Sequence, residues 1–110
     1  MQYRDILTLP VLAAAALTAC RFVSPTGALP TAGGNALGVA LSDIASGDTG
    51  SVITLGTAPV EASAAIAKGA AVEVIADGRI VTNTSGVTVA RALQAATAAG
   101  QIIEVLLVAN

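Results

Sequence analysis

Glycine and proline divide this chain into short apolar segments, and this division constrains the fold more than any other feature. The 110 residues include 11 Gly and 4 Pro, a density of turn residues that favours short strands joined by tight turns. The clearest case is residues 71–82, where two apolar runs flank Asp77-Gly78. Because Asp-Gly is a preferred dipeptide of tight hairpin turns, this stretch is predicted to be a β-hairpin.

The other apolar segments predict a mainly β fold. The expected strands cover residues 6–9, 21–23, 36–41, 51–55, 58–62, 71–75, 79–82 and 101–108. Residues 89–99 are the exception, because Ala90, Leu93 and Ala96 recur at helical spacing and Gly100 is placed to end a helix. We therefore expect a small β-barrel or sandwich-like domain of short strands, with one short helix near the C-terminus over about residues 89–99.

Charge and residue content exclude several classes of function. Five Lys and Arg against seven Asp and Glu give a net charge of −2, whereas a nucleic-acid-binding protein needs a basic surface. The chain has no His, so it lacks the base of a Ser-His-Asp relay, and one Cys forms neither an intrachain disulfide nor a cysteine zinc site. Only 11% of residues are charged, which favours a protein held in an assembly or against a membrane.

The carboxylates and glycines indicate no catalytic, cofactor or metal site. Asp43 and Asp48 share a polar loop and Asp77 lies in a turn, where Asp side chains commonly bond to nearby backbone groups. The polar loop lacks the spacing of a calcium-binding loop, and Gly33-Gly34 is not followed by the Lys-Ser/Thr of a phosphate loop. We expect no enzyme activity, no cofactor and no metal. The other charged residues either belong to a solvated surface or fix the register of a subunit interface. They are Arg4, Asp5, Arg21, Lys68, Arg79, Arg91 and Glu104.

The stretch of low charge over residues 6–20 raises the question of a membrane anchor. It is shorter than the roughly 20 apolar residues that a spanning helix needs, and it contains Pro10. Residues 17–20, Leu-Thr-Ala-Cys, resemble the lipobox of a bacterial lipoprotein, but Arg4 is offset by Asp5 where a signal needs net positive charge. A bacterial lipoprotein with an exported β-domain anchored through Cys20 is the alternative function. The other interpretation of Cys20 is a small buried hydrophobic residue.

Several phrases, taken in order, resemble the bacteriophage capsid cement (head decoration) family. They cover most of the chain, from about residue 7 to residue 108. The phrases are Arg21-Phe22-Val23 with Gly27; Leu37-Gly38-Val39-Ala40 with Asp43 and Gly47; Ala65-Ile66-Ala67-Lys68-Gly69 with Val72; Ala76-Asp77-Gly78-Arg79; Arg91-Ala92-Leu93-Gln94-Ala95-Ala96; and Gly100-Gln101-Ile102-Ile103-Glu104-Val105-Leu106-Leu107.

The resemblance implies a structural virion protein that is assembled in the host bacterial cytoplasm. Members of the cement family bind the outer surface of the expanded head and stabilise the lattice of the major capsid protein. They commonly form homotrimers at three-fold and quasi-three-fold positions. It implies no nucleic-acid partner and no membrane partner. It also implies a capsid-contacting N-terminal arm over residues 1–12, followed by a single β-rich domain over residues 13–110. The arm residues expected to touch the capsid are Tyr3, Arg4, Asp5, Ile6, Leu7 and Leu9.

Overall fold

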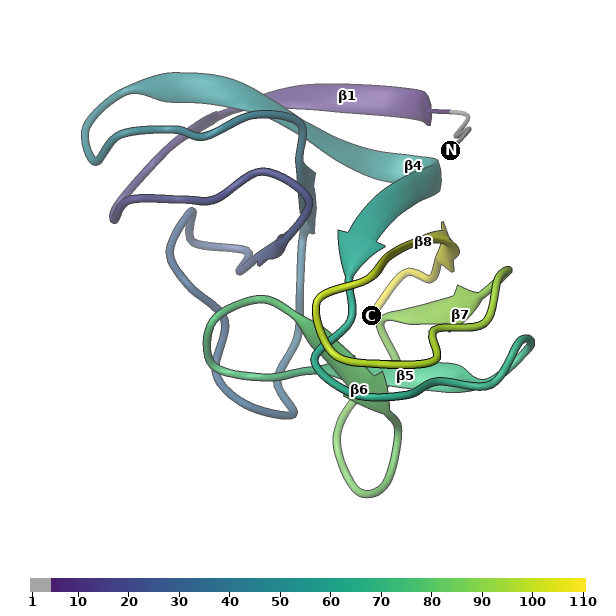
Figure 1. Ribbon diagram of the computed structural model, residues 1–110. Helices are drawn as coiled ribbons and strands as arrows, with labels where there is room; N and C mark the ends of the chain where they lie inside the picture. The colour runs from purple at the N-terminus through teal and green to yellow at the C-terminus, as the bar shows by residue number, and fades with distance from the viewer. Residues whose placement is uncertain (1–4) are drawn as a thin grey trace.

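Eight β-strands and no helix make up residues 5–110, the part of the chain that the computed structural model describes (Figure 1). The strands are β1 (Asp5–Leu12), β2 (Phe22–Val23), β3 (Gly38–Ala40), β4 (Thr49–Glu61), β5 (Ala71–Val74), β6 (Ile80–Thr82), β7 (Ala90–Ala92) and β8 (Ile102–Leu107). They form one curled sheet in the order β2-β3-β4-β8-β7-β5-β6, and β1 also pairs with β4. The prediction of a mainly β fold is confirmed.

The long strand β4 connects the two parts of this sheet and bends between them (Figure 1). Its first half pairs with β1 and β3, and its second half pairs with β8. The sequence predicts two strands here, over residues 51–55 and 58–62, but Gly56 joins them with a φ of 101°. Such a positive φ suits glycine, which has no Cβ to clash with the backbone.

Pro59 lies at a sheet edge, as the sequence predicts. It is opposite Glu104 of β8, whose backbone C=O and N–H bond to Leu93 and to the side chain of Gln94 instead. Pro59 and Glu104 are therefore a non-hydrogen-bonded pair of the antiparallel ladder, in which the two residues face each other without exchanging backbone hydrogen bonds. The missing N–H of Pro59 therefore costs the ladder no bond.

The predicted hairpin is confirmed, with β5 and β6 as its strands. Gly78 takes a φ of 89°, and Asp77 Oδ1 accepts the Arg79 N–H at 3.0 Å, the side-chain-to-backbone bond expected of an Asp in a turn.

The prediction of a helix over residues 89–99 is wrong. Ala90 and Ala92 are buried in β7 while Arg91 between them is exposed, an alternation with the period of a strand. Further along, Ala96 exchanges two backbone hydrogen bonds with Ile66. Pairing with distant segments thus satisfies the backbone groups that a helix would have paired locally, and it overrides the helical preference of alanine. Gly100 does take a positive φ, of 87°, but it ends a bend.

The strands β2 and β3, together with Val52 and Ile53 of β4, form a layer that is buried on both faces. Neighbouring strand residues point to opposite faces, yet Val39 and Ala40 are both buried, and so are Val52 and Ile53. Val39 and Ile53 face the main core, which fills the space inside the curled sheet. The opposite face packs in a second core, which consists of Ala13, Leu17, Val23, Ala40, Ile44 and Val52, with Val11 against it.

The chain consists of two copies of one unit that meet in β4. The pattern Thr-x-Pro-Val-x-Ala occurs over residues 8–13, in β1, and again over residues 57–62, in the second half of β4. The pairing of β1 with β4 matches that of β4 with β8, and the pairs β2·β3 and β3·β4 match β5·β7 and β7·β8. We call residues 8–55 the N-terminal repeat and residues 57–108 the C-terminal repeat. The strand β6 is an addition to the second.

Matching bends follow the matching strands. Leu17 and Ile44 exchange two backbone hydrogen bonds of 2.8 and 2.9 Å, and Ile66 and Ala96 exchange two of the same lengths. We call the segments that these bonds join the N-terminal bends (residues 13–20 and 41–48) and the C-terminal bends (residues 62–69 and 93–100).

The two repeats also bury matching side chains. Each residue of the second core, including Val11, has its counterpart in the main core. The counterparts are Ala62, Ile66, Val72, Ala92, Ala96, Val105 and Val60. Sequence, strand register and core therefore all describe an internal repeat.

Candidate docking surface

The described part of the predicted arm is a strand of the sheet. Residues 5–12 form β1, with Asp5 opposite Gly56 and Leu12 opposite Thr49. Tyr3 and Arg4 lie outside the described residues. The contact residues predicted within β1 are thus presented by a strand that β4 holds in place.

Two large apolar side chains lie next to each other where β1 meets β4. Leu7 is opposite Leu55, and they are 42% and 51% exposed. Leu9 is 37% exposed but lies opposite Val52, which belongs to the second core. The structure therefore assigns Leu7 a partner that the sequence analysis missed. No local sequence signal identifies Leu55, because its position beside Leu7 depends on the long-range pairing of β1 with β4.

The outer edge of β1 is open. Within residues 5–110 no strand pairs with β1 on the side away from β4. Pro10, in the middle of this edge, cannot donate a backbone hydrogen bond, and natural proteins use proline on exposed edges to limit uncontrolled pairing. Any partner strand on this edge would have to tolerate that missing donor.

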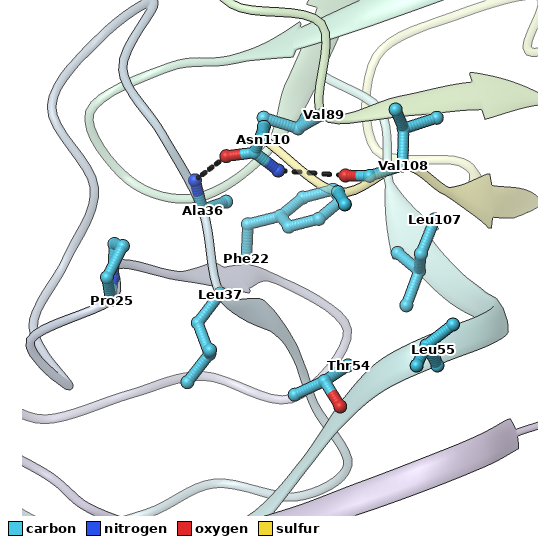
Figure 2. Close-up of a pocket in the computed structure, with 11 residues that line it drawn as sticks. Phe22, Pro25, Ala36, Leu37, Thr54, Leu55, Val89, Leu107, Val108 and Asn110 are labelled. Carbon is cyan, nitrogen blue, oxygen red and sulfur yellow. Dashed lines mark hydrogen bonds between the residues drawn. The ribbon is translucent and has the colours of Figure 1, made fainter.

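An apolar pocket of about 360 Å³ lies beside Leu55, where the two repeats meet (Figure 2). Asn110 spans one side of it, since its Oδ1 accepts the Ala36 N–H at 2.8 Å and its Nδ2 donates to the Val108 carbonyl at 2.9 Å. Phe22 and Leu107 point into the same space (Figure 2). Three matching pairs from the repeats line the pocket: Leu37 with Val89, Thr54 with Leu107, and Leu55 with Val108.

Four charged residues form one cluster between the repeats. Glu61 accepts from Arg21 at 3.2 Å and lies 3.9 Å from Arg79, which is 2.8 Å from Asp77. Partial burial acts to raise the pKa of Asp77, but hydrogen bonds from the Arg79 N–H and guanidinium outweigh it and hold that pKa below its ordinary value. Arg21 and Arg79 were expected to be either solvated or interfacial, and the structure shows that each pairs within the chain.

Glu73 is a buried carboxylate that the sequence analysis did not single out. Its Oε1 accepts the backbone N–H groups of Thr84, Ser85 and Gly86 at 2.6, 3.3 and 3.3 Å. These bonds, led by the one from Thr84, lower the pKa of Glu73. The hydrogen bonds of this carboxylate hold the loop after β6. Glycine is required at position 86 of that loop because a Cβ would lie 2.5 Å from the Gly33 Cα. The carboxylate is structural.

Cys20 is half-buried and has a φ of 62°. Burial, followed by the negative charges of Glu61 and Asp43, raises the pKa of its thiol, so a smaller fraction of the thiol is present as the reactive thiolate. The preceding residues Ala13 and Leu17 are buried in the second core. Cleavage before Cys20, as a lipid anchor there would require, would remove both residues from this core and β1 from the sheet.

The remaining candidates form no cluster. Asp43 and Asp48 are exposed, and Asp43 Oδ1 accepts the Ala19 N–H at 2.9 Å. Over residues 5–110 there is no group of three His, Cys, Asp or Glu that could hold a metal ion. No helix in the same range is long and apolar enough to span a bilayer.

Exposed apolar side chains beside an unpaired sheet edge are typical of proteins that act by binding other proteins. The fold and this surface define a small β-sheet interaction module. The chain belongs to the phage cement protein family, because the model of that family matches residues 1–107. It is thus a capsid-associated structural protein of the virion.

Among solved structures, the N base of the head fiber protein gp8.5 of bacteriophage phi29 is similar to this chain. The TM-score is 0.74 at 20% sequence identity, and the match covers 93% of each chain. This likeness shows a shared fold. No match was found among curated proteins.

Proposed function

We propose that this protein binds the outer surface of the expanded phage head and stabilises the lattice of the major capsid protein. Family membership is the observation that carries the proposal. The surface supports it, because β1 offers an open edge and the exposed pair Leu7 and Leu55 beside that edge. A capsid segment could add to β1 as a strand, with backbone bonds giving affinity and the two leucines giving specificity.

The proposed role is mechanical and involves no covalent chemistry, nucleic acid or membrane. A protein that binds only the expanded shell stabilises that state by mass action. A homotrimer at three-fold and quasi-three-fold positions would bridge neighbouring capsomers, so that weak single contacts sum to tight attachment.

Co-sedimentation with expanded, undecorated heads tests this proposal. We expect the purified protein to bind and to raise the temperature at which the heads are disrupted. Replacing both Leu7 and Leu55 with Ser should weaken binding by about tenfold or more, because truncating an apolar residue at the centre of an interface costs more than about 1 kcal/mol. Leu29→Ser is the matched control, because Leu29 is 47% exposed but lies outside β1 and the pocket. Absence of binding by the unmodified protein would refute the capsid role. Equal binding by all variants would show that Leu7 and Leu55 do not contribute to capsid binding.

A further inference from the structure

The pocket between the repeats has an apolar interior with room for a large side chain. Its volume is about 360 Å³, and its walls include the apolar side chains of Leu37, Leu55 and Leu107. Phe22 also lines it but is only 2% exposed, so its ring lies at the base. Pockets that bind ligands in proteins commonly begin at about 300 Å³ and are lined in this way.

The side-chain amide of Asn110 bridges the two repeats at one wall of this pocket. It accepts the Ala36 N–H of the N-terminal repeat at 2.8 Å and donates to the Val108 carbonyl of the C-terminal repeat at 2.9 Å. These two bonds leave the amide on opposite sides (Figure 2). A trans peptide group of an extended chain presents its C=O and N–H in the same manner. The Asn110 amide therefore makes the two bonds that one peptide group of an added segment would make.

An added segment could replace Asn110 without loss of hydrogen bonds. Asn110 is exposed and lies after the end of β8, so its side chain can turn into water. Ala36 is only 6% exposed, and its N–H needs a partner when it is covered, because an unpaired buried N–H is costly. The C=O of the segment would supply that partner, and its N–H would bond to the Val108 carbonyl.

The pocket adjoins the surface that we propose to contact the capsid. Leu55 lines the pocket and is opposite Leu7 of β1. Thr54 lines it too, and its hydroxyl donates to the Leu7 carbonyl at 3.2 Å. A capsid segment that covers Leu7 and Leu55 would therefore also reach the pocket.

We propose that this pocket binds an extended segment of the major capsid protein that carries one large apolar side chain, and that Asn110 is a latch which the segment displaces. The apolar side chain would lie over Phe22, and one peptide group would take over the bonds to Ala36 and Val108. The inference deepens the proposed function and rests on it only for the source of the segment.

NMR titration of the full-length protein with a short peptide tests the pocket in the absence of heads. The probe is acetyl-Thr-Thr-Phe-Thr-Thr-amide, and the control peptide has Ala in place of Phe. We expect the Phe peptide to shift the methyl signals of Leu55 and Leu107 and the amide signal of Ala36, and the control peptide to leave them unchanged. Asn110→Ala should bind the Phe peptide at least about threefold more tightly, because the latch no longer competes.

A second variant blocks the pocket. Leu37→Trp should fill part of the space and weaken binding of the Phe peptide by about tenfold or more. Leu29→Trp is the matched control, because Leu29 is 47% exposed and lies outside the pocket. Asn110→Ala keeps the test decisive if Leu37→Trp does not fold, since Asn110 is exposed.

Three results of the titration would overturn the proposal. The first is the absence of any shift with the Phe peptide, and the second is equal affinity of Asn110→Ala and the unmodified protein. The third is binding of toluene as tight as that of the Phe peptide. Toluene offers the apolar group without a backbone, so this result would assign the pocket to a free apolar molecule.

Co-sedimentation with expanded heads tests the source of the segment separately. Leu37→Trp should weaken head binding, whereas Leu29→Trp should not. Equal head binding by both variants would overturn the capsid as the source. If the unmodified protein binds the Phe peptide but no heads, the proposed function fails and the peptide-binding pocket stands, so the two failures are distinguishable.

Discussion

Cys20 and Gly69 hold the same position in the two repeats. The Cys20 N–H donates to the Ala40 carbonyl at 3.0 Å, and the Gly69 N–H donates to the Ala92 carbonyl at 2.8 Å. Both residues end a bend with a positive φ, 62° for Cys20 and 87° for Gly69. Cys20 is the one residue within 5–110 that has a positive φ and is not glycine. The left-handed region costs such a residue about 1–2 kcal/mol.

Cys20→Gly is therefore expected to stabilise the protein. Relief of the backbone strain should outweigh lost side-chain contacts and raise the free energy of unfolding by about 1 kcal/mol, or the melting temperature by about 5 °C. Cys20→Ala is the control, because alanine removes the thiol but keeps the strain. Equal melting temperatures for the two variants in a calorimetric scan would contradict the strain argument.

Two glycines of similar φ should respond differently to alanine. At Gly69, with a φ of 87°, an added Cβ meets open space, so Gly69→Ala should cost only the backbone strain of about 1–2 kcal/mol. At Gly78, with a φ of 89°, the Cβ would lie 2.6 Å from the Phe22 carbonyl oxygen. Gly78→Ala should therefore lose clearly more stability in denaturant unfolding. Losses of the same size would mean that the contact with Phe22 adapts freely.

Glu73→Gln should change how stability depends on pH. The pKa of Glu73 is lowered in the folded protein, chiefly by the Thr84 N–H, so its contribution is present above its ordinary pKa of 4.5 and is lost as pH falls through the folded value. The glutamine variant should be less stable than the unmodified protein at pH 7, and this gap should narrow below about pH 4.5. Urea unfolding at a series of pH values measures the gap. A gap that is constant with pH would assign the effect to packing instead of ionisation.

The Arg21–Glu61 ion pair should contribute little by itself. Its side chains are 26% and 22% exposed and 3.2 Å apart, so solvent screens the attraction in part. A double-mutant cycle with Arg21→Ala and Glu61→Ala should give a coupling of about 0.5–1 kcal/mol. The coupling should decrease in high salt. A coupling of several kcal/mol would show that the pair is desolvated in solution.

Features set by neighbouring residues could be predicted from the sequence, and those set by distant pairing could not. The hairpin at Asp77-Gly78 was predicted because its turn and both its strands are local. The prediction of a helix at residues 89–99 failed. The spacing of Ala90, Leu93 and Ala96 fits a helix, but the structure is decided by the backbone hydrogen bonds between Ala96 and Ile66.

The internal repeat was present in the sequence but was obscured. Thr-x-Pro-Val-x-Ala occurs twice, yet the small residues between these anchors diverge, and β6 interrupts the second copy. For the docking surface, the sequence could indicate Leu7 and Leu9 as apolar residues near the N-terminus. It could not show that Leu55 lies beside Leu7, because a β-bulge shifts the register of β1 against β4 at that point.

The two repeats share β4 and have no linker between them. Neither repeat can be pulled away from the other without tension passing along the backbone of this one strand. Its first half is flanked on both sides by β1 and β3, and its second half pairs with β8. Loss of either half would strip β4 of its neighbours and expose the core of the other, so the domain should yield to load as a single unit, without hinging at Gly56.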